Sequence, residues 1–507
     1  MTLAVVTSRA LDGLEAPEVQ VEVQLANGLP SFTLVGLADT EVKEARERVR
    51  AALQQSGFSF PHNKRITVNL APAELPKESG RFDLPIALGI LAAGGQLDTA
   101  RLARCEFAGE LSLAGELRPV RGALALALAA RRCGLVRTLV LPAASARAAA
   151  QVPGVDVRAA TTLAEVVAAL LPGDAAVPLP QAVPWPRLPA AAGPDLRDVK
   201  GQAGAKRALE IAAAGGHSLL LIGPPGTGKS MLAQRLAGLL PPLAEGEALA
   251  SAALQGLNHS AADAAPFAQR PLRCPHHTAS AVALVGGGSP PQPGEISLAH
   301  GGLLFLDELP QFARTALEAL REPLETGVIT ISRAARRASF PAQFQLVAAM
   351  NPCPCGWLGA PARSGRFCRC TPEAVARYQG RLSGPLLDRI DLQVEVLAAS
   401  AAELLALPEG EPSAAVAARV AVALARALQR QGEPNARLAA GALDKHCSLD
   451  EPAARFLRSA AESLGWSGRR LHRCLKVART IADLAASETV NTAHVAEALQ
   501  LQRVLPG

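Results

Sequence analysis

The length, composition and charge of the chain exclude several classes of protein. Its 507 residues are too many for one ordinary hydrophobic core, so we expect two to four domains. The 51 basic and 45 acidic residues leave a net charge of +6, which permits a nucleic-acid partner without requiring one. Without a secretory signal pattern or an uncharged apolar stretch of ~20 residues, we expect a cytoplasmic protein with no membrane partner.

Residues 1–172 alternate strand-like and helix-like runs, which predicts a mixed α/β N-terminal domain. Strands are expected at 19–28, 66–72 and 138–142, and helices at 39–57, 83–95 and 123–134. The next segment, 173–195, contains six prolines. Because proline disfavours helix and removes a backbone donor, we interpret this segment as a semi-rigid linker.

Residues 196–399 contain the first motif with a specific chemistry, GPPGTGKS at 223–230. An apolar strand-like run precedes it and a helix-like run follows, which is the context of a phosphate-binding loop. Its glycines let backbone N–H groups face the phosphates of ATP. We expect Lys229 to reach the β- and γ-phosphates and the Ser230 hydroxyl to hold Mg²⁺. The candidate ATP-binding residues are Gly223, Pro224, Pro225, Gly226, Thr227, Gly228, Lys229 and Ser230. A glycine turn without a ligand is the alternative.

Two further apolar strands end in polar groups that suit the same reaction. LLFLDE, at 303–308, ends in two carboxylates. Asp307 is predicted to support Mg²⁺, and Glu308 to orient or deprotonate the attacking water. FQLVAAMN ends in Asn351, whose amide suits the γ-phosphate or that water. A helix cap at Asp307 and a turn at Asn351 are the alternatives. These strands and crossover helices predict an ATPase core with a mostly parallel sheet.

Four cysteines follow Asn351 as C-x-C…C-x-C: Cys353, Cys355, Cys368 and Cys370. Four thiolates complete a tetrahedral zinc site, and the metal would order an intervening loop that has no apolar core. Disulfides are disfavoured in a reducing compartment, so free or redox-active thiols are the alternative. We predict a structural zinc site.

Strand signals stop at about residue 400, and the segment 400–507 is predicted to form a helical C-terminal domain. The run LHRCLKVARTIADL places Leu471, Leu475, Ala478, Ile481 and Ala482 on one helical face.

These motifs carry a family resemblance. GPPGTGKS, LLFLDE and AAMN resemble an AAA+ ATPase. Longer strings are similar to the magnesium-chelatase-like ComM (YifB) family over essentially the whole chain; they are RCPHHTASAVALVGGG, PGEISLAHGGLLFLDELPQF, AAMNPCPCG, SGPLLDRIDL and SGRRLHRCLKVARTIADL. The resemblance implies a homohexameric bacterial helicase that uses ATP and Mg²⁺ for branch migration during recombination in natural transformation. Its implied partners are single-stranded DNA and branched recombination intermediates.

The resemblance also implies roles for three residues around ATP. Asn351 takes the sensor-1 position, and Arg389, in LLDRIDL, is the arginine finger offered to a neighbouring subunit. Arg469 matches sensor 2, which reports the γ-phosphate to the helical domain. From the residues alone, a structural pair of Arg389 with Asp388 or Asp391 is the alternative. Arg470 is the rival of Arg469 for the sensor-2 role.

Two segments are candidates for contact with DNA. Residues 327–344 predict a strand, a basic tip carrying Arg333, Arg336 and Arg337, and a returning strand. The resemblance implies that this hairpin faces the pore of a ring, where arginines contact phosphates; a solvated turn is the alternative. Residues 274–300 are too rich in glycine and proline for a long helix and resemble the insertion in helix 2 of this clade. His276 and His277 there are candidate DNA contacts, or structural or metal-associated residues.

The N-terminal run ELPKESGRFDLPIALGILAAGG, at 74–95, resembles the Lon protease domain, which has a ribosomal-S5-like fold. Phe82 stands where that family has its serine, and no lysine occurs near Leu126, so we predict the fold without protease chemistry. Two other functions share the same ATPase chemistry: a magnesium-chelatase-like motor and a protein-remodelling ATPase acting on a protein partner.

Overall fold

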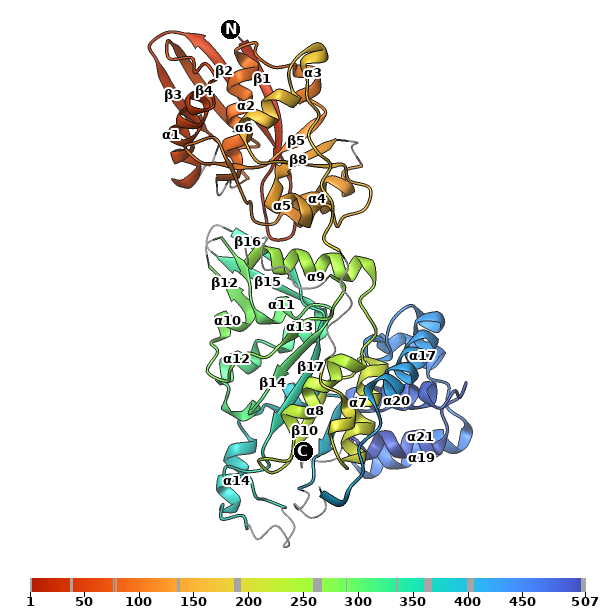
Figure 1. Ribbon diagram of the computed structural model, residues 1–507. Coiled ribbons are helices and arrows are strands. Elements are labelled where there is room, and N and C mark those ends of the chain that lie inside the picture. Colours follow the sequence, from red (N-terminus) through yellow and green to blue (C-terminus); the bar gives the residue numbers. More distant parts are fainter. Residues whose placement is uncertain are drawn as a thin grey trace.

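The computed structural model describes residues 2–36, 40–75, 77, 80–134, 137–186, 193–258, 267–288, 290–333, 336–359, 367–398 and 405–502. A mixed α/β part, a core built on a five-stranded sheet and a helical part follow one another along the chain (Figure 1). This arrangement confirms the predicted α/β fold class, with a parallel sheet in the core and helices after it.

A seven-stranded sheet organises the N-terminal part, in the order β3-β4-β2-β1-β5-β8-β9. Strand β1 pairs antiparallel with β2, and β2 pairs antiparallel with β4, whereas the remaining neighbours are parallel. Buried and less buried residues alternate along β2, as its sequence pattern predicts. The strands are β1 (Thr2–Arg9), β2 (Glu18–Asn27), β3 (Ser31–Val35), β4 (Lys64–Ala71), β5 (Cys105–Phe107), β8 (Thr138–Pro142) and β9 (Val157–Ala160).

Helix α2 (Asp83–Ala93) is buried along its whole length against β1 and β2. A Cβ added to Gly89 would lie 2.5 Å from Val23 Cγ2, so glycine allows the helix to approach the sheet closely. The other helices of this part are α1 (Thr40–Gln55), α3 (Thr99–Leu102), α4 (Ala123–Arg132), α5 (Ala143–Ala149) and α6 (Leu163–Ala169). Phe82 and Leu126, at the two positions compared with a protease dyad, are both buried apolar residues.

The proline-rich segment predicted as a linker lies partly against the N-terminal sheet. The Ala159 amide donates to the Pro180 carbonyl at 3.0 Å, and the Ala182 amide donates to the Val157 carbonyl at 2.8 Å. This stretch therefore continues the sheet beside β9, while residues 187–192 of the segment lie outside the described ranges.

The core sheet is parallel throughout, in the order β11-β14-β17-β10-β18. Every residue of β14 (Leu303–Leu306), β17 (Gln345–Met350) and β10 (Leu219–Ile222) is buried, as their continuous apolar runs predict. The edge strands β11 (Leu272–Arg273) and β18 (Leu392–Glu395) were not predicted. The first has two residues, and the second mixes buried and exposed positions, so neither forms an apolar run.

The segment between the nucleotide motifs forms short elements, as its glycine and proline content predicts: α10 (Ala281–Val285), β12 (Gly286–Gly287), β13 (Gln292–Pro293) and α11 (Glu295–Leu298). Residues 327–344 form the predicted hairpin, with β15 (Val328–Arg333) antiparallel to β16 (Arg336–Pro341).

Helix α9 (Glu245–Asn258) of the core packs against α4 of the N-terminal part (Figure 1). Leu249 and Ala253 of α9 share one apolar cluster with Leu124 and Leu126 of α4. The Gly122 amide also donates to the Gly256 carbonyl at 3.2 Å. The two parts therefore share buried surface.

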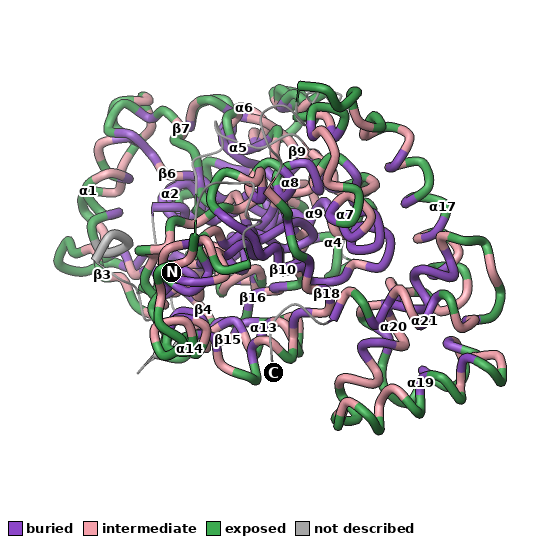
Figure 2. Tube along the Cα trace, turned by 90° about the horizontal axis from the view of Figure 1, so that it is seen from below, coloured by how far each residue is buried: buried purple, intermediate pink, exposed green. Residues whose placement is uncertain are grey.

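The C-terminal part consists of helices packed on the core helix α7 (Ala203–Gly215). The apolar face predicted on α20 (Gly468–Leu484) is confirmed, because Ala478, Ile481 and Ala482 are buried and Leu471 and Leu475 pack beside them. Buried residues concentrate around β10, α7 and α8 (Lys229–Leu236), whereas α19 is mostly exposed or intermediate (Figure 2). The remaining helices of this part are α17 (Ser413–Gln431), α18 (Leu443–His446), α19 (Glu451–Ser463) and α21 (Thr492–Gln500). In the described ranges, every helix is too short or too polar to cross a bilayer.

Candidate nucleotide and metal sites

The loop 223–228 connects β10 to the N-terminus of α8. Gly226 and Gly228 have φ angles of +79° and +85°, which favour glycine. A Cβ on Gly223 would lie 2.2 Å from the Val396 carbonyl oxygen, so only glycine fits where this loop passes the end of β18. The Thr227 hydroxyl donates to the Pro224 carbonyl at 2.9 Å and closes the turn. This backbone directs the loop toward the carboxyl ends of the strands, where open α/β sheets bind ligands.

Lys229 joins this loop to the end of the neighbouring strand β17. Its ammonium donates to the carbonyls of Gly223 and Pro224, both at 2.8 Å, and to Asn351 Oδ1 at 3.1 Å. Burial lowers the pKa of Lys229, and the carboxylates of Asp307 and Glu308 oppose that shift. The structure therefore brings Lys229 and Asn351 together, 122 positions apart in the chain.

Ser230 and Asp307 meet across the same edge. The Ser230 hydroxyl donates to Asp307 Oδ2 at 2.6 Å, and the Glu308 amide donates to Asp307 Oδ1 at 2.9 Å. A hydroxyl and a carboxylate are oxygen ligands that suit Mg²⁺ next to a phosphate. The donor set therefore fits a magnesium ion.

Glu308 follows Asp307 in a left-handed conformation, with φ of +53°, and its side chain is half exposed. His277 Nδ1 lies 3.7 Å from Glu308 Oε2, and the rings of His276 and His277 contact each other at a tilt of 35°, with centroids 4.1 Å apart. The two histidines predicted to contact DNA thus lie beside the acidic end of β14. The sequence does not predict the proximity of these histidines to Glu308, because no spacing rule links the two motifs.

Arg389 and Arg469 both form ion pairs with one carboxylate, that of Glu325 in α13 (Arg321–Thr326). Arg389 Nη2 pairs with Glu325 Oε2, and Arg469 Nη2 donates to Glu325 Oε1 at 3.3 Å. The hydrogen bond from Arg389 holds the pKa of Glu325 below its usual value. No motif contains Glu325, so the sequence alone does not identify it as a site residue.

The rival pairings considered for these arginines involve other residues. Asp388 lies 3.5 Å from Arg473, and Asp391 accepts from the Ser218 amide at 3.1 Å. Arg470 donates to the Gln502 carbonyl at 2.9 Å and stacks over Trp466. The structure therefore groups Arg389 with Arg469 rather than with Arg470.

The hairpin places the basic residues at its tip. Arg333 and Arg336 are the last register pair of β15 and β16, and their side chains lie outside the described part of the chain. Arg337 stands opposite Ser332 and is exposed. The backbone thus agrees with the predicted strand, basic tip and returning strand.

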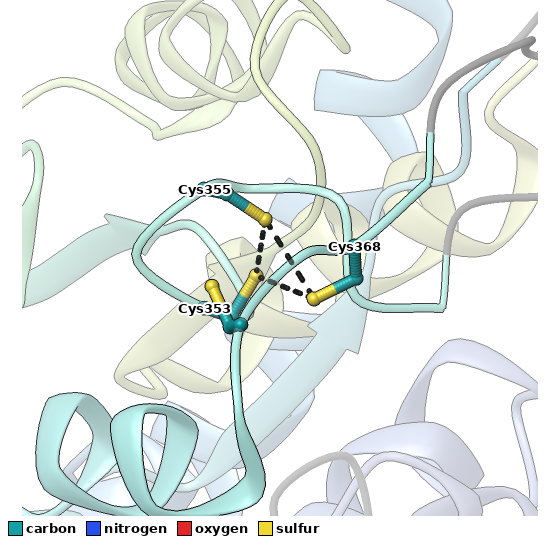
Figure 3. Close-up of side chains that lie close together, drawn as sticks. Cys353, Cys355 and Cys368 are labelled. Atoms are coloured by element: carbon teal, nitrogen blue, oxygen red, sulfur yellow. Dashed lines mark hydrogen bonds between the residues drawn. The ribbon is translucent and has the colours of Figure 1, made fainter.

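The four cysteines converge, although up to 17 positions separate them. The Sγ separations are 3.4 Å for Cys353 and Cys355, 3.7 Å for Cys353 and Cys368, and 3.6 Å for Cys355 and Cys368 (Figure 3). The Cys370 sulfur lies within 4.8 Å of the other three. Four sulfurs bound tetrahedrally to zinc at ~2.3 Å would be separated by about 3.8 Å. The sulfur positions therefore fit a zinc ion.

Backbone amides around these sulfurs support the same interpretation. The Leu358 amide donates to Cys353 Sγ at 3.4 Å. Hydrogen bonds from the backbone amides of Trp357 and Arg369 lower the pKa of the Cys355 thiol to about 6, whereas desolvation and the neighbouring sulfurs raise the pKa of the Cys368 and Cys370 thiols. Donors aimed at sulfur stabilise the thiolate form, which is the form that binds metal.

A phosphate-binding loop follows the interior strand β10 of a parallel sheet, an amide lies at the end of the adjacent strand β17, and acidic groups lie at the end of the next strand, β14. This arrangement defines a P-loop ATPase of the AAA+ class. Family models agree along the chain: "Subunit ChlI of Mg-chelatase" matches residues 21–145, "Magnesium chelatase, subunit ChlI" matches 195–404, and "Magnesium chelatase, subunit ChlI C-terminal" matches 410–502.

Curated relatives match nearly the whole chain. The competence protein ComM of Haemophilus influenzae is 49% identical over 503 residues, covering 98% of this chain and 97% of the relative. The uncharacterized protein YifB of Salmonella typhimurium is 48% identical over 507 residues, with 99% and 98% covered. The protein YifB of Escherichia coli is 47% identical over 505 residues, with 99% and 98% covered. The chain belongs to the ComM/YifB family of magnesium-chelatase-like AAA+ ATPases.

Proposed function

We propose that this AAA+ ATPase is a homohexameric DNA motor that drives branch migration of recombination intermediates. The contact between Ser230 and Asp307, at 2.6 Å, is the observation that carries the ATPase part of the proposal. The name of the Haemophilus relative, a competence protein, supports a role in the recombination of incoming DNA during natural transformation. We place this activity in the cytoplasm, where ATP is present and thiols stay reduced.

Each group at the nucleotide site has a proposed task. The loop 223–228 and Lys229 bind the phosphates of ATP, and Ser230 and Asp307 hold Mg²⁺, which neutralises phosphate charge when bound. Glu308, whose side chain is half exposed, takes the proton of the attacking water. Asn351, already bonded to Lys229, positions that water or the γ-phosphate.

Arg389 and Arg469 are proposed to act together on one nucleotide, that of a neighbouring subunit. Their common attachment to Glu325 supports this assignment, because it presents two guanidinium groups at one place. A planar guanidinium stabilises charge that spreads over phosphate oxygens during transfer. A ring of subunits would bring each pair to the next phosphate-binding loop.

We propose the hairpin β15–β16 as the element that binds DNA. Arg333, Arg336 and Arg337 at its tip would contact phosphates of single strands or of branched intermediates without reading the sequence. His276 and His277, in the neighbouring insertion, are proposed to assist while remaining close to Glu308.

We also propose that Cys353, Cys355, Cys368 and Cys370 hold one zinc ion in a structural role. The sulfur separations and the amides directed at sulfur support it. Metal analysis of the purified protein should give about one zinc per chain. A metal-free protein with four titratable thiols would favour the redox alternative.

A second candidate is a motor that acts on a protein partner, as a magnesium-chelatase subunit does. The three family models favour this candidate, because each describes such a subunit. The ATPase site would be the same in both cases.

The deciding experiment measures ATP hydrolysis with and without branched DNA, alongside strand exchange on a synthetic four-way junction. We expect DNA to stimulate turnover, and ATP to drive movement of the branch. The Lys229→Ala variant should show neither DNA-stimulated ATP turnover nor movement of the branch. If DNA leaves ATP turnover unchanged and the branch does not move, the motor that acts on a protein partner becomes the favoured function.

A further inference from the structure

We infer that the four-cysteine cluster braces the phosphate-binding loop, so that binding of ATP depends on the metal. This inference rests on the proposed zinc and ATP sites. It concerns the loop between Asn351 and α14 (Pro372–Gln379), which lies beside the nucleotide site. Among the described residues of 352–371 there is neither a helix nor a strand, so the sulfur cluster, together with a few hydrogen bonds, holds their path.

Gly356 is the contact point between the cluster and the phosphate-binding loop. A Cβ placed on Gly356 would lie 2.6 Å from Pro225 Cδ and 3.2 Å from Pro225 Cγ. It would also lie 3.8 Å from Asn351 Cγ. One glycine therefore packs against the proline ring of the loop and against the amide that is bonded to Lys229.

The position of Gly356 is set by the cysteines on both sides of it. It directly follows Cys355, has a φ of +82°, and donates its amide to the Cys353 carbonyl at 3.0 Å. This turn starts two residues after Asn351. The Pro352 carbonyl between them accepts from Gln379 Nε2 at 2.9 Å, which links the turn to α14.

A bound metal would hold the turn because it joins Cys353 and Cys355 to Cys368 and Cys370 on the far side of the loop. Without the metal, only hydrogen bonds and packing remain to hold Gly356 against Pro225. The turn can then withdraw, and Pro225 and Asn351 lose the surface that orders them around the phosphates. We expect at least a tenfold loss of ATP affinity in that state.

Two glycines of this loop provide a matched pair of variants. Gly356 and Gly359 both have left-handed φ angles, +82° and +74°, so an added methyl group strains the backbone similarly at each. Among the described residues, a Cβ at Gly359 meets no atom within 4 Å, whereas at Gly356 it meets Pro225. Gly356→Ala should therefore weaken ATP binding while zinc stays bound, and Gly359→Ala should leave ATP binding at the wild-type level.

The test measures zinc content by mass spectrometry and affinity for a fluorescent ATP analogue in the full chain, with melting temperature as a check on folding. The metal is removed from the wild type with phenanthroline, which leaves Mg²⁺ free, and is then restored with zinc. Cys368→Ser provides a second route to the metal-free state with Gly356 unchanged. We expect affinity to fall with loss of zinc, to recover on its return, and to fall in Gly356→Ala without loss of zinc.

The contrary outcomes are separable. If the wild-type protein contains no zinc, the proposed metal site is contradicted. If the zinc-bound protein does not bind the ATP analogue, the proposed ATP site is contradicted. If zinc and the analogue both bind, then unchanged affinity in the metal-free protein and in Cys368→Ser overturns the brace. Equal affinities of Gly356→Ala and Gly359→Ala overturn the proposed contact.

Discussion

Arg389 is paired with Glu325, the last acidic residue before the hairpin strand β15. The second oxygen of the same carboxylate faces Arg469. Two arginines that suit a phosphate therefore share one counter-charge within a few residues of the hairpin. Under the proposed function, a phosphate that binds these arginines would take them from Glu325, which would give a physical route from the nucleotide to the hairpin.

Glu325→Gln tests this relationship. Removing the charge should free both arginines for phosphate, so ATP turnover should rise, by up to about fivefold for an exposed ion pair of ~1 kcal/mol. Glu322→Gln, an exposed residue of the same helix, is the matched control. If Glu325→Gln instead loses turnover as completely as Arg389→Ala, the carboxylate is needed to position the arginines.

Lys229→Ala should abolish ATP turnover and leave the fold intact. The ammonium is the group that bridges the loop carbonyls and Asn351, while alanine suits the first turn of α8. Turnover is measured by phosphate release and folding by circular dichroism and melting temperature. Near wild-type turnover would show that the loop does not hold the reacting phosphates.

Arg389→Ala should bind nucleotide and lose turnover by about 10³-fold, as expected for an arginine finger. Arg377→Ala, an exposed arginine of α14, serves as control. If the proposed ring forms, mixing the Arg389 variant into wild-type protein should reduce turnover more than in proportion, because each ring would contain several subunits. Normal turnover of the pure variant would remove Arg389 from this role.

Replacing Arg333, Arg336 and Arg337 together by alanine should weaken DNA binding and reduce its salt dependence. Loss of three phosphate contacts on single-stranded DNA lowers the slope of log affinity against log salt by about 2. The double variant Arg455→Ala and Arg458→Ala, on the exposed side of α19, should leave the slope unchanged. An unchanged slope in the triple variant would place the DNA contact elsewhere.

Because of the buried His300, we expect the folded protein to be less stable in mild acid. Burial lowers its pKa to about 4, and its Nδ1 accepts the Gln343 amide at 3.1 Å. Since the unfolded imidazole titrates near 6.5, the unfolded chain binds more protons between these values. Stability therefore falls as the pH drops below about 6.5, by about 2 kcal/mol at pH 5.

The His300→Asn variant checks this assignment, because an amide oxygen can accept the same hydrogen bond without titrating. Melting temperatures at pH 7.5 and 5.0 should differ more in the wild type than in the variant. Equal differences would assign the acid sensitivity to other groups.

Local patterns predicted the elements that lie in the interior. The apolar runs at β10, β14 and β17 and the helical face of α20 appear where their periodicity places them. The proximity of Ser230 to Asp307, and of Lys229 to Asn351, could also be expected, because parallel strands end at one edge of a sheet.

Other features depend on tertiary packing that no local pattern encodes. Glu325 meets Arg469 across 144 positions, and Glu325 belongs to no motif. The edge strand β18 was missed because one of its faces is less buried, which breaks the apolar run. The attachment of the proline-rich segment to β9 was also unexpected, since it is made by backbone groups that the sequence does not distinguish.

The shared cluster of α9 and α4 has a consequence for dividing the chain into fragments. A fragment that begins after the proline-rich segment would keep Leu249 and Ala253 but lack the N-terminal surface that covers them. The turn around Gly13 would also be lost from the base of the hairpin, where a Cβ on that glycine would lie 3.5 Å from Phe340. The isolated ATPase core would expose an apolar surface that favours aggregation. A loss of activity on truncation would therefore reflect aggregation as much as the absence of a functional domain.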